Sequence, residues 1–304
     1  MIVRDLRLSF AAAALAVASG PSLAADLPSL KAPPLPIAPP PLWTGFYAGL
    51  NAGYGFDAGA GSFFTGSPAA ITATPPQPDV TLGSGLPGSL YPTVSGFLGG
   101  GQVGYNWQVG DRLVLGVEAD IQGRAGGSSS VTSAAVTNVD AFLGAFPIRT
   151  FRAASAQKES DWVGTVRGRL GYLFTPQLLV YGTGGLAYGD AQLSSSTLAV
   201  QNALIPAEVD AGGGYSSDTR IGWTVGAGAE WMFLPQWSAK VEYLYYDLGN
   251  VGLNYSTLTT FTNFGNVAPG LVLNVTSRFN GHIARVGVNY HFSLGGPAPV
   301  VAKY

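Results

Sequence analysis

The most regular feature of the sequence is an alternation of apolar residues with small or polar ones. In WTGFYAGLNAGYGF, residues 43–56, the row from Thr44 to Phe56 is mostly apolar, and the intervening row is largely small or polar. Successive side chains of a β-strand point to opposite faces, so a period of two predicts a strand with two unlike faces. Alternating segments recur along the chain. We predict eight strands, at residues 43–56, 96–109, 112–123, 161–174, 178–189, 220–233, 237–249 and 281–292.

The connections between these segments are of two very different lengths. Three are short turns, at 110–112, 175–177 and 234–236. Four are long and rich in Gly, Ser, Thr, Asn and Pro, at 57–95, 123–159, 193–218 and 248–277. Short turns on one side and long loops on the other are typical of outer-membrane barrels. The predicted fold class is therefore all-β, an eight-stranded antiparallel transmembrane β-barrel with periplasmic turns and extracellular loops.

Ionisable residues keep to one face of most of the predicted strands. Glu118 and Asp120, for example, alternate with Val117, Ala119 and Ile121. In lipid the apolar row must face outward, which sends the charges into a lumen that is just wide enough for side chains. Charges of both signs would pair there and plug the lumen, because a lone buried charge is costly. The predicted lumen charge network is Arg112, Glu118, Asp120, Asp161, Arg167, Arg169, Arg220, Glu230, Lys240, Glu242 and Arg285.

Aromatic residues close the apolar rows, most regularly at the end with the short turns. Such rings favour the headgroup level of a bilayer, whereas a soluble sandwich would more naturally place them in the middle of its core. The implied partners are outer-membrane lipid and lipopolysaccharide, which His282 could meet at the outer rim. The predicted aromatic girdles contain Trp107, Trp162, Phe174, Trp223, Trp231, Phe233 and Trp237.

Composition strengthens the choice of a barrel. Of the 304 residues, 11% are charged and 47% are hydrophobic, against about 25% charged in an ordinary soluble domain. After the first thirty positions no apolar run reaches the roughly 18 residues of a helical span. The near-neutral balance offers no basic footprint for nucleic acid.

The N-terminus has the pattern of an export signal. Arg4 and Arg7 precede a short apolar run, and Ser22-Leu23-Ala24 fits a cleavage site. We predict a signal peptide at 1–24, a proline-rich periplasmic leader at 25–41, a barrel at 42–292 and a C-terminal periplasmic extension at 293–304. Cysteine is absent, so disulfides and a lipoprotein anchor are excluded. The predicted location is the outer membrane of a Gram-negative bacterium.

The segment WTGFYAGLNAGYGF and the ending RVGVNYHF resemble a known group across residues 42–304. The chain is similar to the alphaproteobacterial outer-membrane β-barrel surface proteins, the porin-like antigens related to the OmpA-type transmembrane domain. The resemblance implies that the final strand carries the assembly signal read by the outer-membrane insertion machinery, at Arg285, Gly287, Tyr290 and Phe292. The sequence departs from the pattern because SLGGPAPVVAKY follows the last phenylalanine, which makes the signal internal.

Catalytic chemistry has little support in the sequence. The histidines are His282 and His291, and no serine with an acidic partner converges on either. We predict no enzyme, cofactor or metal site, and a structural role in the envelope and at the surface. Two alternatives remain. One is a narrow porin for small solutes, and the other is adhesion or ligand binding, for example to haem or a host surface, through the extracellular loops. In loop 248–277 the stretch GLVLNV either extends the last strand above the membrane or forms such a surface.

Overall fold

A computed structural model describes residues 43–59, 61–68, 88–141, 146–202, 208–261 and 267–292. The chain divides into two units, Met1–Pro39 and Pro40–Tyr304, and all the described residues belong to the second. The predicted signal peptide, proline-rich leader and C-terminal extension lie outside the described residues. In the described ranges, no helix has the length and apolar character needed to cross a bilayer.

The described residues form twelve strands. They are β1 (Gly45–Asp57), β2 (Ser62–Pro68), β3 (Ser89–Leu90), β4 (Gly96–Val109), β5 (Leu113–Ala125), β6 (Ser128–Ala141), β7 (Phe146–Glu159), β8 (Trp162–Thr175), β9 (Leu178–Asn202), β10 (Glu208–Leu234), β11 (Trp237–Phe261) and β12 (Val267–His291).

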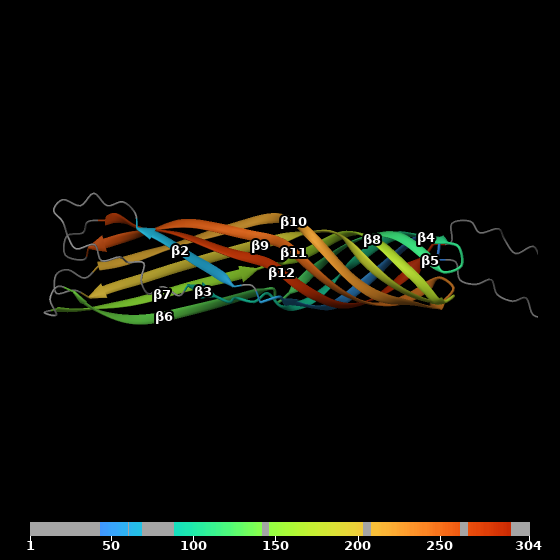
Figure 1. Ribbon diagram of the computed structural model, residues 1–304, viewed down its shortest axis with the longest axis horizontal. Coiled ribbons are helices and arrows are strands. Elements are labelled where there is room, and N and C mark those ends of the chain that lie inside the picture. Colours follow the sequence, from blue (N-terminus) through green and yellow to red (C-terminus); the bar gives the residue numbers. More distant parts are fainter. Residues whose placement is uncertain are drawn as a thin grey trace, which may run out of the picture. The chain divides into compact units, whose positions relative to one another are not determined.

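Eight of these strands close into an antiparallel ring, in the order β1-β4-β5-β8-β9-β10-β11-β12 (Figure 1). The ring is sealed by an unbroken ladder between β1 and β12, from Tyr47↔His291 to Asp57↔Gly281. A closed ring satisfies every backbone group internally, as a lipid environment requires. The predicted eight-stranded barrel is confirmed, with its tight turns at 110–112, 176–177 and 235–236.

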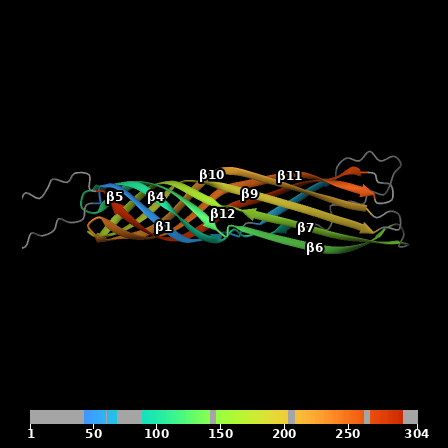
Figure 2. The same ribbon diagram turned by 180° about the vertical axis from the view of Figure 1, so that it is seen from behind.

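Strands also occupy much of the four predicted long loops, which corrects that part of the sequence analysis. Strands β9 to β12 are 25 to 27 residues long and continue beyond the ring. There β2 pairs with β12, β3 with β2, β7 with β9 and β6 with β7 (Figures 1 and 2). Ser, Thr, Gly and Asn look like loop residues in a membrane barrel, but they also suit the water-facing side of a strand. The GLVLNV segment accordingly lies within β12 and pairs with its neighbours.

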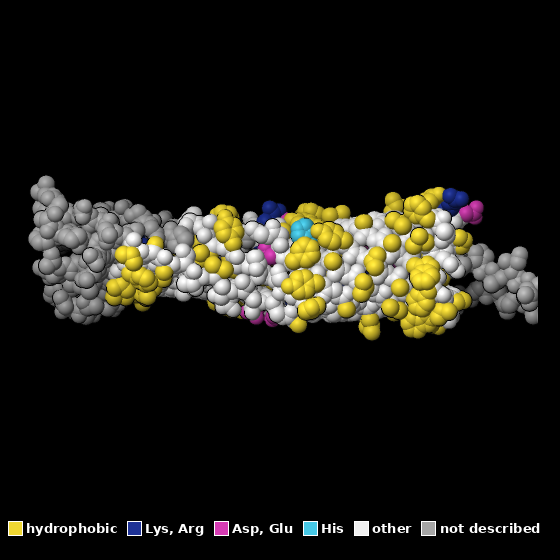
Figure 3. Space-filling view, turned by 90° about the horizontal axis from the view of Figure 1, so that it is seen from below, with side chains coloured by type: hydrophobic (Ala, Val, Ile, Leu, Met, Phe, Trp, Pro, Cys, Tyr) yellow, Lys and Arg dark blue, Asp and Glu magenta, His cyan; other side chains and the backbone are white. Residues whose placement is uncertain are grey.

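At the rim of the ring the strand faces change character: the outward face is apolar in the ring and more polar beyond it, and the inward face changes from polar to apolar. In the ring part of β12, Val286 and Val288 face outward and Arg285 faces the lumen. Farther along the same strand, Val275 and Phe279 point inward and are buried. Figure 3 shows hydrophobic side chains gathered in two groups, one near the middle and one toward the right-hand end of the view, with almost no charged side chains between them. The ring therefore has the surface of a lipid-embedded barrel, and the strand extension has the apolar interior of a water-soluble protein.

A bulge at Gly249 adjusts β11 at this rim. The pairing of β11 with β12 shifts between Asp247 and Asn250, and Gly249 has a φ of 81°. The Gly249 N–H donates to Asp247 Oδ1 at 2.9 Å. The inward row changes here from even positions such as Leu248 to odd positions such as Val251. A left-handed glycine is the residue such a bulge requires.

Substituting this glycine tests the role of the bulge. Gly249→Ala is expected to lower the free energy of unfolding by about 1–2 kcal/mol, because a Cβ disfavours the left-handed backbone even where space is free. Gly252→Ala is the matched control, since it lies on the same strand, has no left-handed φ and also meets nothing within 4 Å. Urea titration in lipid vesicles measures both, and equal stabilities would refute this account of Gly249.

Candidate functional site: the filled lumen

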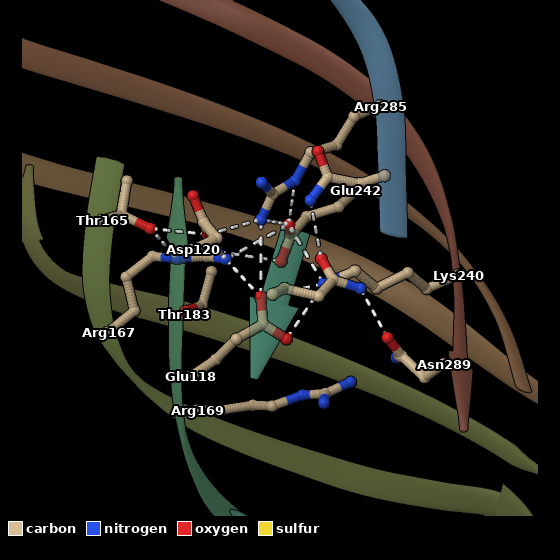
Figure 4. A network of polar contacts seen from close by, with 12 residues as sticks. Glu118, Asp120, Thr165, Arg167, Arg169, Thr183, Lys240, Glu242, Arg285 and Asn289 are labelled. Carbon is tan, nitrogen blue, oxygen red and sulfur yellow. Dashed lines mark hydrogen bonds and ion pairs between the residues drawn. The ribbon is translucent and has the colours of Figure 1, made fainter. Parts of the chain in front are cut away.

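The centre of the lumen holds a cluster of ionised side chains that is formally neutral. Each of the eight is at most 5% exposed, and they comprise four cations and four carboxylates. All eight occupy inward-facing positions on five strands of the ring, and Figure 4 labels seven of them, all but Glu230. The eight are Glu118 and Asp120 of β5, Arg167 and Arg169 of β8, Glu230 of β10, Lys240 and Glu242 of β11, and Arg285 of β12.

Arg167 is the hub of this cluster. Its Nη2 lies 2.5 Å from Glu118 Oε1 and 2.8 Å from Asp120 Oδ2, and its Nη1 lies 2.9 Å from Glu242 Oε1. Arg285 approaches the same three carboxylates, with Nη2 3.0 Å from Asp120 Oδ2 and 3.4 Å from Glu118 Oε1, and with Nε 2.7 Å from Glu242 Oε2. Three carboxylates are thus bridged by two guanidinium groups, which suit planar, multidentate pairing better than an ammonium does.

Lys240 and Arg169 complete the pairing. Lys240 Nζ donates to both oxygens of Glu118, at 2.8 and 2.9 Å. Arg169 pairs with Glu230, and its guanidinium carbon lies 3.8 Å from the centroid of the Tyr181 ring. Every ionised group of the cluster therefore has an opposite charge in contact, which is the condition for tolerating charges out of water.

Polar side chains extend the network away from Arg169. Ser238 donates to Glu230 Oε1 at 2.5 Å, and Asn289 Nδ2 donates to the same oxygen at 2.7 Å. Gln102 Nε2 then donates to Asn289 Oδ1 at 2.5 Å. His291 Nε2 lies 2.9 Å from Ser238 Oγ, which places this histidine in the lumen.

Apolar layers lie on both sides of the charges. Near the short turns, a buried cluster contains Trp43, Val114, Leu173, Leu179, Tyr181 and Met232. Trp43 is anchored there by Nε1, which donates to the Pro176 carbonyl at 3.0 Å. Toward the extension, a second cluster begins with Leu98, Val163, Leu244 and Ile283 and continues between the extended strands. The tube is thus packed in three successive layers: apolar, ionic and apolar.

Eight of the eleven residues predicted for the network lie in it, and three do not. Arg112 belongs to the turn before β5, is exposed, and donates to Tyr172 Oη at 2.7 Å. Asp161 is an exposed residue of the connection before β8. Both predictions are wrong because alternation fixes a side chain's direction only inside a strand ladder.

Arg220 is the third exception. It keeps the inward parity of β10, but it lies where β10 is not paired with β11, between the ladder positions Ala211 and Trp223. Its side chain is 35% exposed and lies 3.4 Å from Asp218. Arg220 therefore pairs with a neighbouring residue of its own strand at a partly exposed site and does not join the lumen network.

A buried ion pair at the rim escaped the sequence analysis. Lys158 Nζ of β7 lies 2.7 Å from Asp57 Oδ2 of β1, donates to the Arg278 carbonyl at 2.7 Å, and lies 4.8 Å from the Phe279 ring centroid. Burial lowers the pKa of the Lys158 amine, and the carboxylate of Asp57 opposes that shift. The pair fastens the β6–β7 hairpin to the ring, and its partners lie in regions predicted to be loops.

Asp190 is a second residue that the alternation could not reveal. Its carboxylate accepts from the backbone N–H groups of Asp161, at 2.8 and 3.0 Å, and of Trp162, at 2.9 Å. It therefore fixes the point where the chain leaves β7 and enters β8. No local sequence pattern indicates this contact, because it depends on β9 lying beside the connection between β7 and β8.

The predicted aromatic girdle residues lie on the outer surface. Six of the seven are exposed, and Trp162 is half-buried with its ring 5.9 Å from Tyr188. At the outer rim, His282 stacks on Phe56 with ring centroids 5.3 Å apart. The residues of the predicted assembly signal divide between the two faces. Arg285 and Gly287 face the lumen, whereas Tyr290 and Phe292 form an outward ring pair at 5.1 Å.

Comparison with known proteins adds to the geometry. The family model for the outer membrane protein beta-barrel domain matches residues 10–292. The chain belongs to this family. A 31 kDa outer-membrane immunogenic protein of Brucella melitensis is 37% identical over 253 residues, covering 82% of this chain and 84% of that protein. A 22 kDa outer membrane protein of Rhizobium leguminosarum is 37% identical over 150 residues, covering 49% and 52%.

The solved structure of OprG from Pseudomonas aeruginosa is also similar, at 9% identity and a TM-score of 0.35, covering 82% of this chain and 97% of that one. Membership of the outer-membrane β-barrel family, together with the closed ring, identifies the protein as an integral β-barrel of the outer membrane. The expected resemblance to alphaproteobacterial surface antigens is confirmed by the Brucella and Rhizobium relatives.

Removing the hub of the network tests how much the barrel depends on it. Arg167→Met leaves three buried carboxylates short of a partner, so the free energy of unfolding is expected to fall by about 3–5 kcal/mol. Arg220→Met removes a half-exposed ion pair and is expected to cost less than about 1 kcal/mol. Both are measured by urea unfolding in vesicles. A similar loss in the two variants would contradict the assignment.

Proposed function

We propose that this outer-membrane β-barrel has a structural role in the envelope and at the cell surface, with a lumen that its paired charges close to solutes. The neutral cluster around Arg167, held between two apolar layers, is the observation that carries the proposal. A conducting pore needs an open path for water and ions, and buried side chains occupy the lumen in the ionic cluster and in the apolar clusters on both sides of it. On this proposal the protein acts by its presence in the membrane and performs no reaction.

The outer surface supports the proposed partners. Exposed aromatic rings at both ends of the apolar band suit the headgroup regions of lipid and lipopolysaccharide. His282, with Nδ1 2.8 Å from Tyr243 Oη, lies in an aromatic group at the outer rim. Tyr290 and Phe292 present the outward half of the assembly signal that the insertion machinery is proposed to read.

Planar-bilayer recording tests the closed lumen against the porin alternative. The refolded wild type is expected to show no open-channel steps. The paired variant Arg167→Ser/Glu242→Ser is also expected to stay closed, because the apolar layers block the tube in series with the ionic one. Arg220→Ser/Asp218→Ser is the matched control, since it removes an ion pair outside the lumen.

Heat-modifiable gel migration of the same proteoliposomes shows that each variant is folded and inserted. Steady conductance of the wild type would overturn the proposal in favour of a narrow porin. Conductance of the lumen variant alone would show that the ionic layer is the only barrier, which contradicts the layered closure.

A further inference from the structure

The sheet that continues beyond the ring is open along one side. Its strands follow the order β3-β2-β12-β11-β10-β9-β7-β6. In the described part of the chain, β6 pairs only with β7, and β3 approaches β6 without forming a ladder with it. Among the described strands β6 therefore ends the sheet, beside β7 in Figures 1 and 2, and the edge that faces away from β7, called the free edge below, has no ladder partner there.

The facing rows of β6 and β7 differ in burial. On β7, the inward residues Lys158, Ala156 and Ala154 are buried. Their partners on β6 point the same way but remain partly exposed, namely Ser129, Val131 and Ser133. Val131 packs against the apolar core of the extension while staying half-open to solvent. One more strand beside β6 would cover this row.

The free edge also offers a regular set of backbone groups. The ladder of β6 with β7 has no register shift, and the Gly127 carbonyl accepts from the Ser160 N–H at 3.1 Å. Antiparallel hydrogen bonding alternates, so every second residue from Gly127 bonds to β7 and the residues between them direct N–H and C=O away. The outward-directed set in the described stretch is Ser128, Ser130, Thr132, Ala134 and Val136.

Strand β6 carries little of the usual protection against strand addition, since its one charged residue is Asp140, next to its C-terminal end. Natural edge strands are blunted by lysine, proline, bulges or shortness. Residues 128–139, SSSVTSAAVTNV, contain no charge and no proline, and the strand is 14 residues long. Backbone groups in this arrangement are complementary to an extended peptide and to little else.

We propose that the free edge of β6 is a docking site for an extended, uncharged segment of another protein, which adds to the sheet as a further strand. Its inward side chains would be small or apolar, because they would lie beside Ser129, Val131 and Ser133 and extend the core that Val131 touches. A second copy of this chain in the same membrane fits less well. Copies with a common orientation would present β6 edges running in parallel, and parallel pairing is the less stable kind.

The test measures binding of a labelled peptide of alternating threonine and valine, with lysines at its ends, to the full protein in lipid nanodiscs. Wild type is expected to bind this peptide and to ignore the same peptide with N-methylated backbone amides. Thr132→Pro removes an edge N–H without touching the β7 ladder, so binding should weaken by about tenfold or more. Thr132→Ala keeps that N–H and should bind like wild type.

Ser130→Pro repeats the test at a second edge position in case Thr132→Pro fails to fold, as judged by heat-modifiable migration. No binding to wild type, or equal binding by the proline and alanine variants, would overturn the proposal. So would wild-type dimers that dissociate in Thr132→Pro, because the occupant would then be a second copy. The edge lies outside the lumen, so none of these results bears on the closed barrel.

Discussion

The structure depends on charge neutrality inside a closed ring. Lipid outside the ring leaves the ionised side chains of the strands only one place to go, and the narrow lumen brings them into contact. Arg167 and Arg285 bridge Glu118, Asp120 and Glu242, so no member of the set is left as an isolated buried charge. The same contacts that make the charges tolerable also occupy the lumen, and apolar clusters lie on both sides of them; on the proposed function these layers together close the barrel to solutes.

Strands β9 to β12 continue from the lipid-facing ring into the water-facing extension and keep the same order. Along β12 the outward face is aliphatic in the ring and carries Asn274 and Arg278 in the extension, while the inward face changes from Arg285 to Phe279. On β11 the bulge at Gly249 resets the inward row at the same level. Ring strands thus support a surface sheet directly, and the Lys158–Asp57 pair fastens its β6–β7 hairpin to the rim.

Sequence alone predicts the part of the molecule governed by the period of two. The ring, its turns and the inward positions of residues such as Glu118 and Arg167 follow from alternation, since lipid imposes a single rule on every strand. Alternation has no meaning at strand ends, which is why Arg112 and Asp161 were misplaced. Apart from the alternative that GLVLNV lengthens the last strand, the extension was missed, because small polar residues serve loops and water-facing strands equally well. The Lys158–Asp57 contact joins residues 101 positions apart, and no local pattern records such a pairing.

Reaction of a single cysteine in the lumen is the most direct test of a filled barrel, and the natural absence of cysteine makes it clean. Thr183 of β9 is 8% exposed, lies beside the ionic layer in Figure 4, and donates to the Gly168 carbonyl at 2.9 Å. Thr183→Cys in proteoliposomes should resist a charged, membrane-impermeant thiol reagent until the protein is unfolded. Tyr215→Cys, at a site 64% exposed, should react at once. Reaction of the folded Thr183→Cys protein at a comparable rate would mean that water and ions reach the centre of the tube.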